Sequence, residues 1–156
     1  MSETEEKIEE KDSRKEISKK MIESTKQWKS IVKDLSTRLR GDVKNVIDIQ
    51  SEAISHRQDV VEEIRTYSIK IYKLVQKMKV LTKARFEFYA TSYQVKTSGT
   101  EKLKLIEADL SEYQLFINEL DEHVSFLRET SKDLDLINYS VKNKIELTNI
   151  LGGYKW

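Results

Sequence analysis

The chain contains no proline and only four glycines in 156 residues. A sheet protein of this length needs turn residues between many short strands, whereas long helices need few stops. Hydrophobic residues make up 38% of the sequence, which is low for a compact globule, and charged residues make up 35%. We therefore expect an all-α fold, in which long helices form a hairpin or bundle that is completed by homo-oligomerisation.

Apolar residues at helical spacing predict the first two helices. A helix over about residues 16–40 carries one apolar stripe, formed by Ile17, Met21, Trp28, Ile31, Val32, Leu35 and Leu39. Gly41 then ends this helix, and Asp42 is a candidate N-cap for a helix over about 42–89. The second helix carries apolar residues seven apart, at Val46, Ala53, Val60, Tyr67, Leu74, Leu81 and Phe88. This is a heptad pattern, weak before Val60 and regular after it.

The remaining segments complete a single expected domain over residues 16–156. Ser and Thr are frequent in 90–100, which predicts a loop ending near Gly99. A third helix is expected over about 101–151, because apolar residues continue at spacings of three and four. Residues 1–15 are a mixed-charge segment that we expect to be disordered or a frayed helix.

Opposite charges separate along the chain although the net charge is only +1. Between residues 65 and 104 there are ten basic and two acidic residues, whereas between 105 and 138 there are two basic and nine acidic ones. Such blocks suit two different partners, or head-to-tail contact between copies of the chain.

The basic block is interleaved with aromatic residues, as single-stranded nucleic-acid binding requires. Cations can follow a phosphate backbone while bases stack on rings. The candidate DNA-binding residues are Lys73, Lys77, Lys79, Lys83, Arg85, Phe86 and Tyr89. The alternative interpretation is a solvated helix face, on which lysine stems cover apolar neighbours.

The segment Lys83-Ala84-Arg85-Phe86-Glu87-Phe88-Tyr89 resembles a motif of the UvsY-type recombination mediators of large tailed phages. The likeness extends over about residues 60–153, through an acidic block and a long C-terminal helix. It implies a non-catalytic protein that binds single-stranded DNA, forms a ring, and helps a RecA-like recombinase to replace single-strand-binding protein. Residues 1–40 have no counterpart in this pattern, and the loop at 90–100 lacks the Gly- and Asp-rich character of the family.

The resemblance also assigns roles to individual residues. Lys83 and Arg85 correspond to the DNA-contacting cations, and the helix from about 103 to 150 corresponds to the self-association element. The candidate self-association residues are Leu110, Ile117, Val124, Leu134, Val141 and Ile145. Residues two apart on a helix point about 200° apart. Either the helix ends near Lys83, or Arg85 reaches a groove formed with a neighbouring copy, which we favour.

Several kinds of chemistry are not expected. The glycines are too few and too scattered for a phosphate-binding loop, and His56 and His123 belong to no metal-binding pattern. We therefore expect no enzyme activity, no cofactor and no metal. The chain has no cysteine, no signal-peptide pattern and no apolar run of about 20 residues, which predicts a soluble protein in the cytoplasm. The resemblance to phage proteins implies that this is the cytoplasm of an infected bacterial host.

Two functions compete at this point. The first is a single-stranded-DNA-binding recombination mediator. The second is a structural helical-bundle or coiled-coil adaptor, in which the basic block of one copy pairs with the acidic block of another and nucleic acid has no role. A membrane-surface protein is a weaker third, because the basic face lacks a broad free apolar face beside it.

Overall fold

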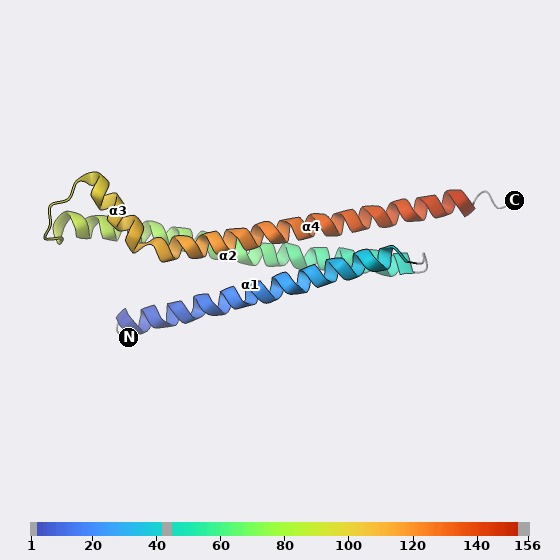
Figure 1. Ribbon diagram of the computed structural model, residues 1–156, viewed down its shortest axis with the longest axis horizontal. Helices are drawn as coiled ribbons and strands as arrows, with labels where there is room; N and C mark the ends of the chain where they lie inside the picture. Colours follow the sequence, from blue (N-terminus) through green and yellow to red (C-terminus); the bar gives the residue numbers. More distant parts are fainter. Residues whose placement is uncertain (1–2, 42–44, 153–156) are drawn as a thin grey trace. The chain divides into compact units, whose positions relative to one another are not determined.

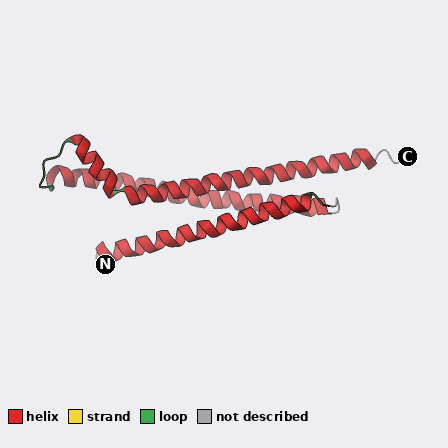
Figure 2. Cartoon of the chain, viewed as in Figure 1, coloured by secondary structure: helices red, strands yellow, loops and turns green. Residues whose placement is uncertain are grey.

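The computed structural model describes residues 3–41 and 45–152, and all regular structure in these ranges is helical (Figure 2). In chain order the helices are α1 (Glu3–Leu39), α2 (Val46–Thr91), α3 (Gly99–Asp109) and α4 (Ser111–Gly152) (Figure 1). No strand occurs in the ranges described. The all-α prediction is therefore confirmed, whereas Asp42, the expected N-cap, lies outside the described residues.

Helix α1 begins earlier than the sequence pattern indicated. Residues 3–15, where we expected disorder or a frayed helix, are its first turns. Oppositely charged side chains four apart support the helix, because Arg14 pairs with Glu10 at 3.2 Å and Lys20 pairs with Glu16 at 3.0 Å. Without proline or glycine, nothing in this segment interrupts the backbone hydrogen bonds.

The helix expected over about 101–151 is broken at Leu110, which separates α3 from α4. The backbone of Leu110 departs from helical geometry, with φ −103° and ψ 5°. Its side chain is buried with Tyr89 and Ile106, and the Ser111 hydroxyl donates a hydrogen bond to the carbonyl of Ala108 at 2.9 Å. The helix is therefore interrupted at the buried Leu110, although no proline or glycine lies at this point of the sequence.

The start of α3 has a sequence-encoded cap. Ser98 accepts a hydrogen bond from the backbone N–H of Glu101 at 3.3 Å, and the Glu101 carboxylate accepts one from the backbone N–H of Ser98 at 2.8 Å. The hydrogen bonds from Ser98 lower the pKa of Glu101. The loop predicted at 90–100 is confirmed in shorter form, because α2 ends at Thr91 and α3 begins at Gly99.

The described residues group into two compact units. The first unit contains α1, α2 up to Arg65 and α4 from His123, and the second contains α2 from Thr66, α3 and α4 up to Glu122. The expectation of one domain over residues 16–156 stays a prediction.

In the first unit, α1 and α2 run antiparallel. Glu63 of α2 contacts Ser24 and Trp28 of α1, and Glu52 accepts hydrogen bonds from both terminal nitrogens of Arg38 at 2.7 and 2.8 Å. The hydrogen bonds from Arg38 lower the pKa of Glu52. A bidentate pair of this kind joins the last turn of α1 to the second turn of α2.

The C-terminal part of α4 completes a three-helix arrangement in this unit. Arg57 of α2 pairs with Asp135 at 2.6 Å, and Lys144 of α4 donates hydrogen bonds to the carbonyls of Leu39 and Gly41, each at 2.7 Å. These carbonyls lie at the C-terminal end of α1, where a cation is favourable. The core between the helices is formed by Met21, Trp28, Leu35, Val46, Ile49, Ala53, Val60, Val124, Leu127, Leu134, Ile137 and Val141.

A polar network centred on the half-buried Glu63 lies at the edge of this apolar core. Its carboxylate accepts hydrogen bonds from the hydroxyl of Ser24 and from Nε1 of Trp28, the latter at 2.7 Å, and it lies 3.5 Å from Nε2 of His123. Burial alone raises the pKa of Glu63, but the hydrogen bonds from His123, Ser24 and Trp28 outweigh it and hold that pKa below its ordinary value. One carboxylate therefore connects α1, α2 and α4.

In the second unit, the buried position on α2 shifts by one residue. The heptad pattern placed Phe88 in the seam, but Phe88 is exposed and Tyr89 is buried. An α-helix drifts about 20° per heptad relative to a 3.5-residue repeat, so over the four heptads from Val60 the drift approaches the 100° between neighbouring residues. Tyr89 packs with Ile106 and Leu110.

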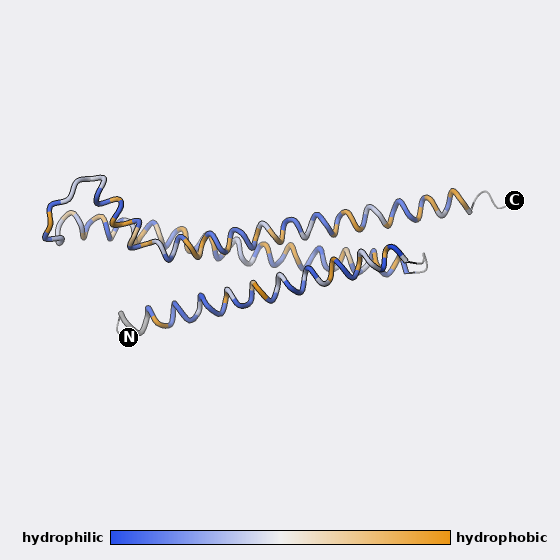
Figure 3. Tube along the Cα trace, viewed as in Figure 1, coloured by the Kyte–Doolittle hydropathy of each residue, from blue (hydrophilic) through white to orange (hydrophobic). Residues whose placement is uncertain are grey.

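Hydropathy varies from turn to turn along the helices, as Figure 3 shows, and neither hydrophobic nor hydrophilic residues form a long uninterrupted stretch. None of the helices described here has the length and apolar content needed to cross a membrane.

Replacing Leu134 by alanine should lower the free energy of unfolding by about 2–5 kcal/mol, because this fully buried side chain would leave a cavity. Urea unfolding followed by circular dichroism measures the change. Leu136→Ala is the matched control, since Leu136 lies two residues away with 63% of its surface exposed. Equal destabilisation by the two substitutions would contradict the assigned core.

Glu63→Gln should lower the free energy of unfolding at pH 7 by about 1–3 kcal/mol, since the donors of Ser24 and Trp28 then face a neutral amide in place of a charged carboxylate. The folded-state pKa is depressed, so this stabilisation is present above the unfolded pKa of about 4.3 and is lost as pH falls through the folded pKa. Urea unfolding at pH 7 and pH 3 tests this. If the difference in free energy of unfolding between wild type and Glu63→Gln is as large at pH 3 as at pH 7, the role assigned to the charged carboxylate is contradicted. Glu23→Gln is the control, because Glu23 is exposed.

Candidate nucleic-acid interface

An exposed strip of polar and aromatic side chains runs along α2 in the second unit. It consists of Tyr72, Gln76, Lys79, Lys83 and Phe86, whose spacings of four and three place them on one helical face. Gln76 is half-buried and the other four are exposed. We call it the outer strip. Tyr72 at one end is 65% exposed and Phe86 at the other is 41% exposed. At 1.5 Å per residue, the strip is about 21 Å long.

The cations of the outer strip are available to a ligand. Lys79 and Lys83 are exposed, and neither forms a salt bridge with any carboxylate of the described residues. Lys73 is also exposed and lies about 100° around the helix from Tyr72. All four predicted lysines, Lys73, Lys77, Lys79 and Lys83, are therefore exposed on α2.

Lys77 occupies a different position from these lysines. Its ammonium lies 5.5 Å from the centre of the Tyr113 ring on α4, which is a cation–π distance. The side chain is thus engaged within the second unit and does not belong to the outer strip, although the sequence grouped it with the other lysines.

Arg85 is turned away from the outer strip and lies beside α3. Helix α2 continues past Lys83 to Thr91, so the possibility that it ends near Lys83 is wrong. The Nε of Arg85 lies 3.7 Å from Oδ2 of Asp109. Within one copy the partner of Arg85 is an acidic residue of the same chain, and the preferred alternative, a groove formed with a neighbouring copy, stays a prediction.

Tyr89 is buried, and this overturns its predicted role as a ring on which bases stack. Only 8% of its surface is exposed, and its hydroxyl donates a hydrogen bond to Oδ2 of Asp109 at 2.7 Å. That hydrogen bond, together with burial, raises the pKa of Tyr89. Phe88 and Tyr93 are more exposed and pack against the Tyr89 ring, with ring centres 5.2 and 5.0 Å away.

Most of the residues predicted to mediate self-association are buried within the chain itself. Leu110, Ile117, Val124, Leu134 and Val141 belong to the cores of the two units, and Ile145 is half-buried. Their seam is filled by contacts within one copy, and their role in self-association stays a prediction. In the first unit, the exposed apolar residues of α4 are Leu136, Tyr139, Leu147, Ile150 and Leu151. Their spacing places them on the side of α4 opposite its buried stripe.

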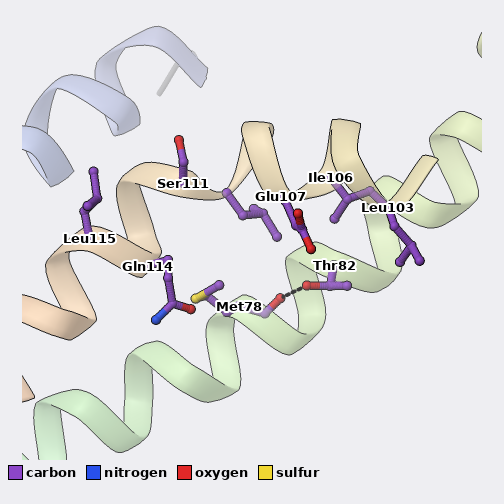
Figure 4. Close-up of a pocket in the computed structure, with 9 residues that line it drawn as sticks. Met78, Thr82, Leu103, Ile106, Glu107, Ser111, Gln114 and Leu115 are labelled. Atoms are coloured by element: carbon purple, nitrogen blue, oxygen red, sulfur yellow. Dashed lines mark hydrogen bonds between the residues drawn. The ribbon is translucent and has the colours of Figure 1, made fainter. Parts of the chain in front are cut away.

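An apolar groove lies between α2, α3 and α4 in the second unit (Figure 4). It has a volume of about 440 Å³ and is lined by Met78, Thr82, Leu103, Ile106, Glu107, Leu110, Ser111, Gln114 and Leu115. The Thr82 hydroxyl does not face the groove as a free donor, because it donates to the carbonyl of Met78 at 2.7 Å. Glu107 is the charged residue in this lining, so the groove disfavours a phosphate group.

The two histidines do not form a metal site. His123 is part of the Glu63 network, and the ring of His56 lies edge-on to Trp28 with 5.8 Å between centres. Across the described ranges, no three His, Cys, Asp or Glu side chains gather in a way that could hold a metal ion.

Comparisons with protein-family models, with curated proteins and with solved structures found no match for this chain. The resemblance to UvsY-type mediators therefore stays a prediction based on the segment from Lys83 to Tyr89 and the spacing that follows it.

Tyr89→Phe should lower the free energy of unfolding by about 1 kcal/mol, because the hydrogen bond to Asp109 is lost while the ring still fills its site. Urea unfolding at pH 7 is the measurement. Tyr93→Phe removes a hydroxyl from a neighbouring, more exposed ring and should change little. If Tyr93→Phe lowers the free energy of unfolding more than Tyr89→Phe does, the assigned role of the Tyr89–Asp109 hydrogen bond is contradicted.

Proposed function

We propose that the chain binds single-stranded DNA along the outer strip of α2 and acts, without catalysis of its own, as a recombination mediator. The observation that carries this proposal is the arrangement of two unpaired, exposed lysines, Lys79 and Lys83, between two exposed rings, Tyr72 and Phe86.

This arrangement suits a single strand better than a duplex. The lysines supply positive charge for backbone phosphates, which is the main source of affinity for nucleic acid. Rings can stack only on bases that are free of their own stacking partners, and each stacked base contributes about 1–3 kcal/mol. Tyr72 and Phe86 could each take one base while Lys79 and Lys83 neutralise the phosphates between them.

The role of mediator rests on the sequence resemblance around Lys83-Ala84-Arg85. Its partners would be a RecA-like recombinase and single-strand-binding protein, and the active form would be a ring of copies. Self-association is supported by the exposed apolar residues of α4, such as Leu136, Leu147 and Ile150, which a second copy could cover.

A helical adaptor is the second candidate function. The apolar groove of the second unit favours it, because an apolar side chain from a partner helix would fill such a groove without any nucleic acid. An adaptor should assemble identically with and without DNA, whereas a mediator should bind single strands in a salt-dependent manner.

The test is fluorescence-anisotropy binding of a labelled single-stranded oligonucleotide across a salt series. If Lys79 and Lys83 each neutralise one phosphate, Lys79→Ala/Lys83→Ala should reduce the slope of log K against log salt by about 1.4. Lys26→Ala/Lys33→Ala is the matched control, since it removes the same charge from exposed positions of α1.

Equal slopes for the two double variants would show that the outer strip is not the binding surface. If the wild type does not bind the oligonucleotide at low salt, the DNA-binding proposal is contradicted and the adaptor function is favoured. Sedimentation of each protein with and without the oligonucleotide separates changes in assembly from changes in binding.

A further inference from the structure

Asp109 is placed between two residues of the segment that suggested DNA binding. Its Oδ2 accepts the hydroxyl hydrogen bond of Tyr89 at 2.7 Å and lies 3.7 Å from Nε of Arg85. Asp109 is the last residue of α3, directly before the buried Leu110. A carboxylate from a different helix therefore meets the motif on α2.

The two cations of the motif are in different situations. Lys83 is exposed and without a salt bridge among the residues described, whereas Arg85, about 200° around the helix from it, faces Asp109. A strand lying on the outer strip meets Lys83 directly. Arg85 points to the other side of α2, so the strand meets it only by passing around the helix toward α3, and only if that side chain exchanges its carboxylate partner for a phosphate.

The geometry indicates which partner of the pair would move. Asp109 is held by the short hydrogen bond from the buried Tyr89 and by the buried residue that follows it in the chain. Arg85 is held by one long contact, and 43% of its side chain is exposed. Exposed ion pairs of this kind contribute little to stability, and a phosphate offers a guanidinium paired hydrogen bonds.

We propose that Asp109 competes with the phosphates of a bound strand for Arg85. In the free protein the Asp109 carboxylate pairs with the Arg85 guanidinium, and a phosphate of the bound strand must displace it. Asp109 thereby limits the affinity of the interface for single-stranded nucleic acid and makes recruitment of Arg85 a second step after contact with Lys83. This inference rests on the proposed function.

The experiment is the same anisotropy titration with Asp109→Asn. The asparagine keeps an oxygen that can accept the Tyr89 hydrogen bond but removes the charge that competes with phosphate. Binding should tighten by about 3- to 10-fold at low salt, as expected for removal of one nearby like charge, and the salt slope should steepen by about 0.7 as one more phosphate is neutralised.

Glu107→Gln is the matched control for charge. Glu107 is exposed on the same helix, two residues before Asp109, and forms no salt bridge among the residues described. An equal gain for Glu107→Gln and Asp109→Asn would show a general field effect and would overturn the proposal, as would weaker binding by Asp109→Asn.

A double-mutant cycle with Arg85→Ala makes the test specific. The gain from Asp109→Asn should disappear in the Arg85→Ala background, because no guanidinium remains to be released. A gain that persists there contradicts the proposal. Circular dichroism checks the fold, and Asp109→Ser repeats the test should the asparagine variant unfold.

The inference and the proposed function fail in different ways. If neither the wild type nor any of these variants binds the oligonucleotide, the proposed function is lost. If the wild type binds and Asp109→Asn binds with the same affinity and slope, only the role of Asp109 is lost.

Discussion

Burial of one apolar stripe on each helix is the constraint on which the other features depend. Because side chains repeat every 3.6 residues, the face that packs inward determines which residues point to solvent. In the second unit, burial of Tyr89 against Ile106 and Leu110 turns Arg85 toward α3 and leaves Lys79 and Lys83 on the outer strip. The candidate interface is therefore a consequence of core packing, and it needs no special backbone geometry.

Two carboxylates add polar contacts between helices to this apolar packing. Glu63 connects three helices of the first unit through Ser24, Trp28 and His123, and Asp109 connects α3 to α2 through Tyr89 and Arg85. The two carboxylates differ in their consequences. Glu63 is half-buried and bonded to donors of the core, so it contributes to stability. Asp109 contacts a cation that is partly exposed and can take another partner.

The sequence pattern predicted the helical class, the end of the first helix near Leu39, and the buried residues Met21, Trp28 and Leu35 of α1 and Val46, Ala53 and Val60 of α2, because the spacing of apolar residues is a local property of the chain. It did not predict the burial of Ile49. The pattern failed where packing between segments distant in the sequence determines which residues are buried and where a helix ends. The break at Leu110 has no proline or glycine. Tyr89 is buried where the heptad pattern predicted Phe88, because the helix drifts relative to a 3.5-residue repeat. The Asp109 contact joins residues far apart in the chain, so the heptad register could place Arg85 inward without identifying its partner.

The central claim is that a single strand lies along the outer strip of α2. Ultraviolet crosslinking of a single strand that contains 5-iodouracil, followed by mass spectrometry of the linked peptides, tests it most directly. The account predicts crosslinks to the peptides that contain Tyr72 and Phe86, at low salt and competed by unlabelled single strand. Crosslinks confined to α1 or to the C-terminal part of α4, or efficient binding without any crosslink to α2, would contradict it.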